Sequence, residues 1–245
     1  MITTIEELSL NAWPSHQTVF YDGWVLRFAN GYTRRANSVN PIYPSSISVD
    51  EKLRFCEQIY QNKKMSPIFK ITSAVYPGNL DEKLATSGYR RDAPTSVQTL
   101  ALETISTRPS QGASLQEDLP ESWLAAYCRM SAVAGPTTPS LRQILLNIIP
   151  RHCFISLSVE NQIIACGLGV LQAGYLGLFD IVTDPLFRKQ GFARQIVNSL
   201  LAWGKQNQAL TAYLQVMLNN APALNLYSSL GFTEIYQYWY RIKAN

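Results

Sequence analysis

The chain has 245 residues, of which 47% are hydrophobic and 16% charged, and its formal net charge is +4. This composition is typical of a globular protein and excludes a disordered one, and no apolar run reaches the about 18 residues of a membrane span. Since the positive charge forms no long basic block, we expect no nucleic-acid partner and no membrane partner, while the oligomeric state stays open.

Residues 1–108 are predicted to form a first domain that mixes strands and helices. Strands are expected at 23–29, 35–42, 67–74 and 95–102, and helices at 48–63 and 79–86. Ser48 followed three residues later by Glu51 is a capping box, which predicts the start of the longer helix. Residues 104–116 are small and polar and contain Pro109 and Gly112, a composition typical of a linker.

Residues 113–245 are predicted to form a second domain. Helices are expected at 121–132 and 140–149, then strands at 152–159, 162–171 and 175–183. A helix at 192–206, a strand at 210–218, a short helix at 222–230 and a strand pair at 232–242 complete the order. Ser140 is expected to cap the second helix, and Gly231 to end the last one.

The most informative segment is the turn between the strand at 175–183 and the helix at 192–206. The first N–H groups of a helix have no internal partner and carry partial positive charge, so a helix start binds anions. Gly191 allows the backbone to come close to a ligand. The turn and its basic neighbours predict a phosphate site made of Arg188, Lys189, Gln190, Gly191, Phe192, Ala193 and Arg194.

Two motifs in this half carry a family resemblance. Arg188, Gly191 and Ala193 match the pattern Gln/Arg-x-x-Gly-x-Gly/Ala. A second pattern, Asn-x-x-Ala-x-x-x-Tyr followed by Gly-Phe, is matched by Asn220, Ala223, Tyr227, Gly231 and Phe232. Together they make the second half resemble the GNAT superfamily of acetyl-CoA-dependent N-acyltransferases. The resemblance implies an α+β protein with the GNAT fold, which is a mixed, mostly antiparallel sheet flanked by helices, here preceded by a truncated GNAT-like domain.

The resemblance also implies that acetyl-CoA is the cofactor and gives the residues their roles. The diphosphate would lie on the N–H groups of the turn, and the pantetheine arm beside the end of the preceding strand. The N–H of Val182 would stabilise the oxyanion that forms when an amine attacks the thioester. The expected cofactor-binding residues are Ile181, Val182, Thr183, Arg188, Lys189, Gln190, Gly191, Phe192, Ala193, Arg194, Asn220, Ala223 and Tyr227.

The expected catalytic residues are Tyr227 and Asp180. Tyr227 would donate a hydrogen bond to the departing thiolate, with core packing as the alternative. Some family members carry a glutamate twelve residues before the tyrosine, where this chain has Gln215, which cannot accept a proton. Asp180 is the nearest carboxylate in the matching region. A structural Asp180 paired with an arginine, a water acting as base, and a neutral amine that needs no base stay open as alternatives.

The predicted function is transfer of an acetyl group from acetyl-CoA to a primary amine by direct attack in a ternary complex. The acceptor is a small-molecule or peptide amine. No cysteine lies in a nucleophile motif, and the four scattered cysteines indicate free thiols in the cytoplasm and no metal site. The alternative function is a non-catalytic acyl-CoA-binding sensor. This alternative stays open because Gln215 stands where some family members carry a glutamate.

The first domain repeats a sequence pattern of the second. Residues 80–89 repeat the short helix, glycine and aromatic residue found at 226–232. In place of the phosphate turn stand residues 40–46, where Pro41 and Pro44 remove N–H donors, so this degenerate domain is not expected to bind coenzyme A. Its polar segment 32–38 either lines the acceptor cleft, docks on the second domain or is an ordinary exposed turn.

Overall fold

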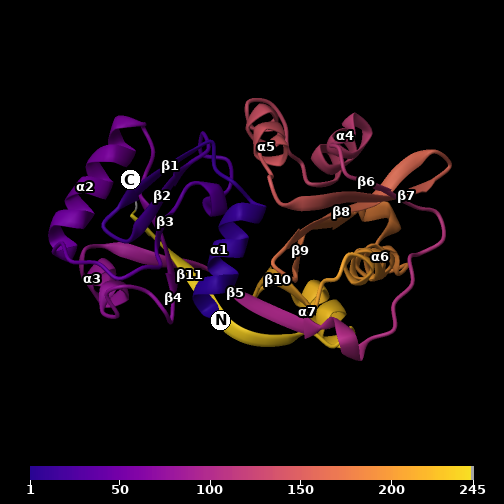
Figure 1. The fold of residues 1–245 in the computed structure, drawn as a ribbon. Helices are drawn as coiled ribbons and strands as arrows, with labels where there is room; N and C mark the ends of the chain where they lie inside the picture. The colour runs from indigo at the N-terminus through magenta and orange to yellow at the C-terminus, as the bar shows by residue number, and fades with distance from the viewer. Residues whose placement is uncertain (244–245) are drawn as a thin grey trace. The chain divides into compact units, whose positions relative to one another are not determined.

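The computed structural model describes residues 1–243, except for the side chain of Thr104 (Figure 1). Within it the chain folds into two compact units. Unit 1 holds Met1–Val97, Val216–Ala221 and the residues from Glu234 onward, and unit 2 holds Gln98–Gln215 and Pro222–Thr233. The division of the chain into domains at 1–108 and 113–245 stays a prediction, because the compactness of a unit does not test its independent folding.

Unit 1 is built on a sheet with the strand order β1-β2-β3-β4-β11. Neighbouring strands in this order are antiparallel except for β3 and β4, which are parallel and joined through α2. The next strand, β5 (Tyr89–Ala101), contributes residues to both units. The other elements are α1 (Ile2–Ala12), β1 (Gln17–Tyr21), β2 (Trp24–Phe28), a 3₁₀ turn (Arg34–Ala36), β3 (Val39–Pro41), α2 (Val49–Asn62), β4 (Ile68–Thr72), α3 (Leu80–Thr86) and β11 (Thr233–Lys243).

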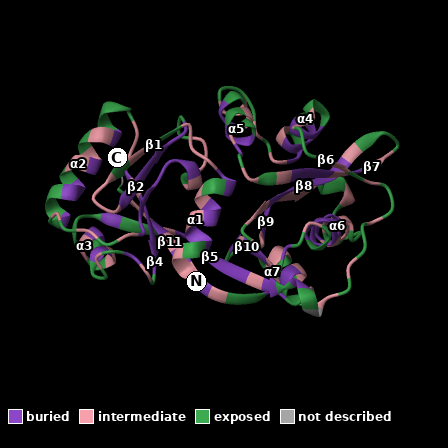
Figure 2. Ribbon diagram, in the orientation of Figure 1, coloured by how far each residue is buried: buried purple, intermediate pink, exposed green. Residues whose placement is uncertain are grey.

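The core of unit 1 lies between its sheet and the helices α2 and α3. The hydroxyl of Ser48 accepts the N–H of Glu51 at 3.4 Å, which confirms the predicted cap of α2. The helix then buries Cys56 and Tyr60 in the same cluster as the strand residue Leu26. Figure 2 shows the matching pattern along α2, with buried residues alternating with exposed ones. The packing of α2 on the sheet therefore follows from its helical periodicity.

A buried ion pair fixes α1 within unit 1. The carboxylate of Glu6 on α1 lies 2.6 Å from Lys70 Nζ on β4, and both side chains are at most 5% exposed. The hydroxyl of Tyr236 donates to the other oxygen of Glu6 at 2.7 Å, and Lys70 Nζ lies 3.9 Å from the centre of the Tyr238 ring. Both charges are thus compensated, which a buried pair requires.

We expect Lys70→Met to lower the free energy of unfolding by about 3–5 kcal/mol, because it leaves the carboxylate of Glu6 buried without its counter-charge. Chemical denaturation would measure the loss. Lys83→Met is the matched control, since Lys83 forms an exposed pair with Asp50 at 3.1 Å that is worth about 0–1 kcal/mol. Equal losses in the two variants would contradict a stabilising role for the buried pair.

Unit 2 has the strand order β10-β9-β8-β7-β6. In Figure 1, α4 and α5 lie on one side of its sheet and α6 on the other. The register is antiparallel from β6 to β9, whereas β9 and β10 run parallel. The elements are β6 (Ala113–Gln116), α4 (Glu121–Met130), α5 (Thr137–Leu146), β7 (Arg151–Val159), β8 (Gln162–Gln172), β9 (Tyr175–Thr183), a 3₁₀ turn (Pro185–Phe187), α6 (Phe192–Gln206), β10 (Thr211–Met217) and α7 (Ala221–Ser229).

Several predicted elements were wrong. The sequence analysis missed α1 and β1, and it placed a linker where β6 pairs with β7. The strand expected at 35–42 is a 3₁₀ turn followed by the short β3, and the final strand pair is the single strand β11. Ser140 does not cap α5, because the helix begins at Thr137 and buries Ser140 inside it. The end of α7 is as predicted, since Gly231 is left-handed with φ +92°.

Candidate functional site

The candidate site lies where β9, α6 and β10 form a parallel crossover in unit 2. The two strands pair from Tyr175 with Thr211 to Leu178 with Leu214. Beyond this point β9 continues to Thr183, and its residues change from buried to half-buried. The strand end that the resemblance assigned to the pantetheine arm is therefore the less buried end of β9.

The turn before α6 has the geometry of an anion site. Gly191 is the N-cap residue of α6 with φ +85°, and no side chain caps this helix start. A Cβ placed on Gly191 would meet no atom within 4 Å. Lys189 is also left-handed with φ +61°, and both residues are exposed. Left-handed residues alternating along a turn orient successive N–H groups toward one side, as in anion-binding nests.

Basic side chains surround this turn. Arg194 on α6 donates to Ser229 Oγ on α7 at 2.6 Å, and Arg188 Nε donates to the carbonyl of Thr183 at 3.4 Å. Asp184 caps the preceding 3₁₀ turn by accepting the N–H of Leu186 at 3.1 Å. Asp184 also pairs with Arg129 at 2.5 Å. The hydrogen bond from Leu186, followed by that from Arg129, lowers the pKa of Asp184. The carboxylate of Asp184 is therefore engaged by neighbouring groups of the protein and has a structural role in this turn.

Asp180 lies in a β-bulge of β9. The register with β8 shifts between Cys166 and Leu168, and Asp180 is left-handed with φ +51°. The alternation of side chains between the two faces of a strand is therefore interrupted at Asp180. Val182 lies opposite Cys166 in the register beyond the bulge, and the role expected for its N–H stays a prediction.

A tyrosine of α4 holds the carboxylate of Asp180. The hydroxyl of Tyr127 donates to Asp180 Oδ1 at 3.2 Å. The ring of Tyr127 stacks on Trp123 with centroids 5.3 Å apart and planes 2° apart, and Trp123 Nε1 donates to the carbonyl of Ile155 at 2.9 Å. The sequence analysis predicted the helix that carries both aromatic residues and gave neither of them a role at the site. No local signal could have identified Tyr127, because its partner Asp180 is 53 positions away.

The second motif lies on and before α7. Ala223 and Tyr227 are one helical turn apart, and Tyr227 is the buried residue of this helix at 8% exposure. Its ring contacts Phe232 edge-on at 5.8 Å. Burial raises the pKa of Tyr227 to about 12, so the phenol keeps its proton at physiological pH. Asn220 is exposed in the turn before α7, and Gln215 is half-buried on β10.

One orphaned polar atom supports a ligand beside β9. Thr183 Oγ1 is buried and has no hydrogen-bond partner among the residues that the structure describes. A buried hydroxyl without a partner costs free energy unless a ligand or water supplies one. Together with the uncapped helix start at Gly191, this hydroxyl fits a group rich in hydrogen-bonding atoms, as the diphosphate and amides of acetyl-CoA are.

The cysteines are not suited to nucleophilic catalysis. All four are free, and Cys56, Cys153 and Cys166 are buried. Burial raises the pKa of Cys56 and Cys153 to about 12 and raises that of Cys166 further, so these groups stay thiols at neutral pH. Within residues 1–243, no group of three or more His, Cys, Asp or Glu side chains could hold a metal ion, and no helix is long and apolar enough to cross a membrane.

The polar segment 32–38 of unit 1 is organised by Asn37. Asn37 Oδ1 accepts the N–H groups of Ala29 and Gly31 at 2.7 and 3.0 Å, and Nδ2 donates to the carbonyls of Tyr32 and Thr33 at 2.7 and 2.8 Å. Asn37 therefore has an internal structural role. A groove of about 750 Å³ in unit 1 contains none of the predicted site residues, and is lined by His16, Gln17, Phe28, Asn30, Gly31, Lys63, Lys64 and Met65.

Comparison with known families accounts for this arrangement. Residues 1–241 match the family described as "Probable histone acetyltransferase Rv0428c C-terminal". The chain belongs to this family of GNAT acetyltransferases. The match spans both halves of the protein, whereas the motifs identified in the sequence lie in the second half only. The family match confirms the predicted GNAT superfamily.

Relatives and solved structures agree with the assignment of this GNAT protein. It is 29% identical to "Uncharacterized N-acetyltransferase YobR" of Bacillus subtilis over 247 residues, covering 99% of this chain and 98% of that protein. It is 29% identical to the [ribosomal protein bS18]-alanine N-acetyltransferase of Salmonella typhimurium over 117 residues, covering 48% and 76% of the two chains. A GCN5-related N-acetyltransferase from Kribbella flavida shares the fold with a TM-score of 0.74 and 12% identity, covering 99% of this chain and 95% of that one.

Proposed function

We propose that this GNAT acetyltransferase moves an acetyl group from acetyl-CoA to a primary amine by direct attack in a ternary complex. The observation that carries the proposal is the open, uncapped and basic helix start at Gly191, which suits a diphosphate. Acetyl-CoA supplies the thioester when bound. Lys189–Ala193 would hold its diphosphate, and Thr183 would hydrogen-bond to the pantetheine arm.

Asp180 is the general base of the proposed reaction. Its carboxylate would take the proton of the amine as the nitrogen attacks the thioester carbonyl, and the carbon–sulfur bond then breaks. The N–H of Val182 would stabilise the charge on the carbonyl oxygen. Tyr127 is a positioning residue, because its hydroxyl holds the Asp180 carboxylate through Oδ1. Tyr227 would donate a hydrogen bond to the departing sulfur.

The acceptor is proposed to be a small-molecule or peptide amine. The named activity of the Salmonella relative toward an alanine of a ribosomal protein makes a peptide N-terminus a reasonable first choice. The test is release of free thiol from acetyl-CoA by the purified protein with a panel of polyamines, amino acids, aminoglycosides and peptides that begin with alanine. If acetyl-CoA binds and no amine drives turnover, the transfer reaction is refuted and the acyl-CoA sensor remains.

We expect Tyr227→Phe to lower kcat about tenfold, because it removes one hydrogen bond to a developing charge. The affinity for acetyl-CoA should stay within about twofold in a calorimetric titration. Since Tyr227 keeps its proton up to about pH 12, the loss should be the same across the physiological pH range. A variant that melts several degrees lower at unchanged kcat would assign Tyr227 to packing instead.

A further inference from the structure

Unit 1 contains a counterpart of the crossover that forms the proposed site in unit 2. In unit 2, the parallel strands β9 and β10 are joined through α6. In unit 1, the parallel strands β3 and β4 are joined through α2, a helix of 14 residues. The turn before α2, residues 42–48, therefore corresponds in the fold to the turn before α6. The two turns differ in what lies against their N–H groups.

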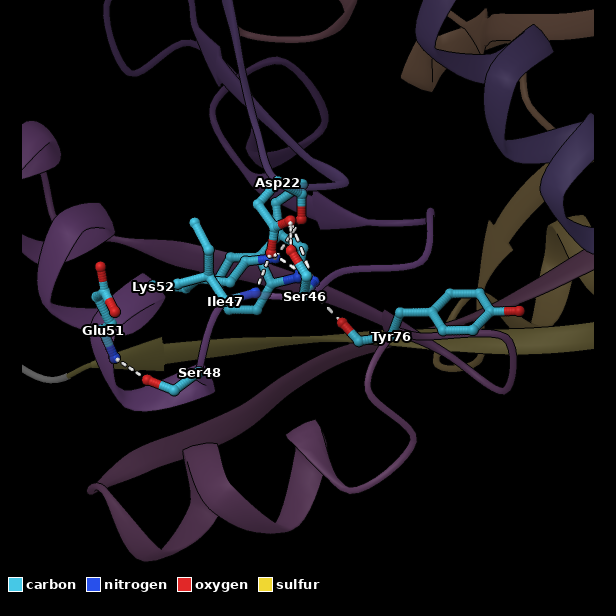
Figure 3. A network of polar contacts seen from close by, with 8 residues as sticks. Asp22, Ser46, Ile47, Ser48, Glu51, Lys52 and Tyr76 are labelled. Atoms are coloured by element: carbon cyan, nitrogen blue, oxygen red, sulfur yellow. Dashed lines mark hydrogen bonds and ion pairs between the residues drawn. The ribbon is translucent and has the colours of Figure 1, made fainter.

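The turn of unit 1 holds a carboxylate from the same chain. The N–H of Ser46 lies 3.1 and 3.0 Å from the two carboxylate oxygens of Asp22, and the Ser46 hydroxyl donates to Oδ1 at 3.0 Å. The N–H of Ile47 donates to Oδ2 at 2.8 Å. Figure 3 shows both residues directed at the Asp22 carboxylate. These bonds, above all the one from Ile47, hold the pKa of Asp22 well below its usual range, so it is charged.

A buried lysine completes this cradle. Lys52 Nζ lies 3.2 Å from Asp22 Oδ2, and its side chain is fully buried. Nζ also donates to the carbonyl of Asp22 and lies 4.2 Å from the centre of the Trp24 ring. Successive backbone N–H groups of a turn, a hydroxyl and an ammonium are donors that proteins use for phosphate and carboxylate anions. Here the anion comes from the protein.

The β1–β2 hairpin delivers this carboxylate. Asp22 and Gly23 are its two turn residues, both left-handed with φ +40° and +79°. A Cβ on Gly23 would collide with the carbonyl oxygens of Tyr43 and Pro44, so only glycine lets the hairpin come this close to the turn. The Asp-Gly pair thus forms the turn of the hairpin, and its Asp22 carboxylate occupies the N–H groups of the turn before α2.

We propose that the turn before α2 is an anion-binding site of unit 1 whose resident ligand is the Asp22 carboxylate, and that the chain therefore binds one acetyl-CoA and not two. The second clause rests on the proposed function, because it counts the site at Gly191. The first clause concerns unit 1 alone. The sequence analysis expected Pro41 and Pro44 to prevent coenzyme A binding in unit 1, whereas in this proposal the Asp22 carboxylate prevents it by occupying the donors.

Chemical rescue tests the anion site. Asp22→Gly keeps a turn that two glycines can form and removes the carboxylate, so its melting temperature should fall. Sodium formate or inorganic phosphate should raise the melting temperature of this variant by several degrees more than sodium chloride of equal ionic strength. Wild type and Asp118→Gly, which removes an exposed carboxylate of unit 2, should show no such excess.

Equal responses of Asp22→Gly and wild type to these anions would overturn the proposal. If Asp22→Gly does not fold, Asp22→Asn provides the second measurement, since it keeps the size of the side chain and removes its charge. A melting temperature of Asp22→Asn equal to that of wild type would also overturn the proposal, because the cradle would then not require an anion.

Calorimetric titration with acetyl-CoA tests the stoichiometry. We expect one site per chain in the wild type, with an affinity that is about a hundredfold lower in Gly191→Glu. Two sites in the wild type would overturn the count and leave the acetyltransferase function in place. No binding in the wild type would refute the proposed function, whereas the rescue experiment would still decide on the anion site of unit 1.

Discussion

Gly191→Glu is expected to weaken acetyl-CoA binding about a hundredfold or more. The new side chain would place a negative charge at the helix start, where Gly191 is exposed and a Cβ has free space. Charge-assisted hydrogen bonds contribute about 1.5–3 kcal/mol each, so losing two of them accounts for an effect of this size. Isothermal titration calorimetry would measure the affinity directly.

Gly112→Glu provides a matched control. Gly112 also lies in unit 2, is left-handed with φ +82°, and a Cβ added to it would meet no atom within 4 Å. The backbone strain and the added charge are therefore the same, and the affinity for acetyl-CoA should stay that of the wild type. If both variants bind acetyl-CoA as tightly as the wild type, the diphosphate does not lie on the turn before α6.

Asp180→Asn is expected to lower kcat about 10²–10⁴-fold, the usual contribution of a general base, because an amide cannot take the proton of the amine. The substitution preserves size and shape. The affinity for acetyl-CoA should therefore change little, which a titration of the purified variant would verify. Steady-state kinetics with the best amine of the panel would measure the loss.

Tyr127→Phe separates the positioning of Asp180 from its chemistry. It keeps the stacking on Trp123 and removes the hydroxyl that donates to Asp180, so kcat should fall about tenfold while KM for acetyl-CoA stays unchanged. Tyr175→Phe, at the start of β9, serves as control and should keep wild-type kinetics.

Full activity of Asp180→Asn would contradict its role as general base and leave water or a neutral amine as the alternatives.

The parts of the site that depend on neighbouring residues could be predicted from sequence. Gly191 precedes a helix with a clear apolar stripe, and both motifs are continuous segments, so the turn and α7 were placed correctly. The helix start at Ser48 was found for the same reason. In each case the signal is a short pattern whose physical cause, a cap or a turn, involves residues only a few positions apart.

The contacts that join distant segments could not be predicted in this way. Tyr127 and Asp180 are 53 positions apart, and Asp22 and Ser46 are 24 apart. An Asp-Gly pair indicates a hairpin whether or not its carboxylate meets another turn. The bulge at Asp180 depends on how β8 and β9 align, which the composition of β9 does not determine. The four-residue β6 is too short to show periodicity.

The position of β11 has a consequence for synthesis on the ribosome. This strand pairs with β4 in unit 1, Tyr238 opposite Thr72 and Ile242 opposite Ile68, although all of unit 2 is translated between them. Domains commonly fold in the order in which they emerge. Unit 1 therefore cannot complete its sheet until β11 has left the exit tunnel. Until then, the edge of β4 that pairs with β11 stays unpaired. Nascent chains stalled before residue 233 should therefore recruit chaperones that released full-length chains do not.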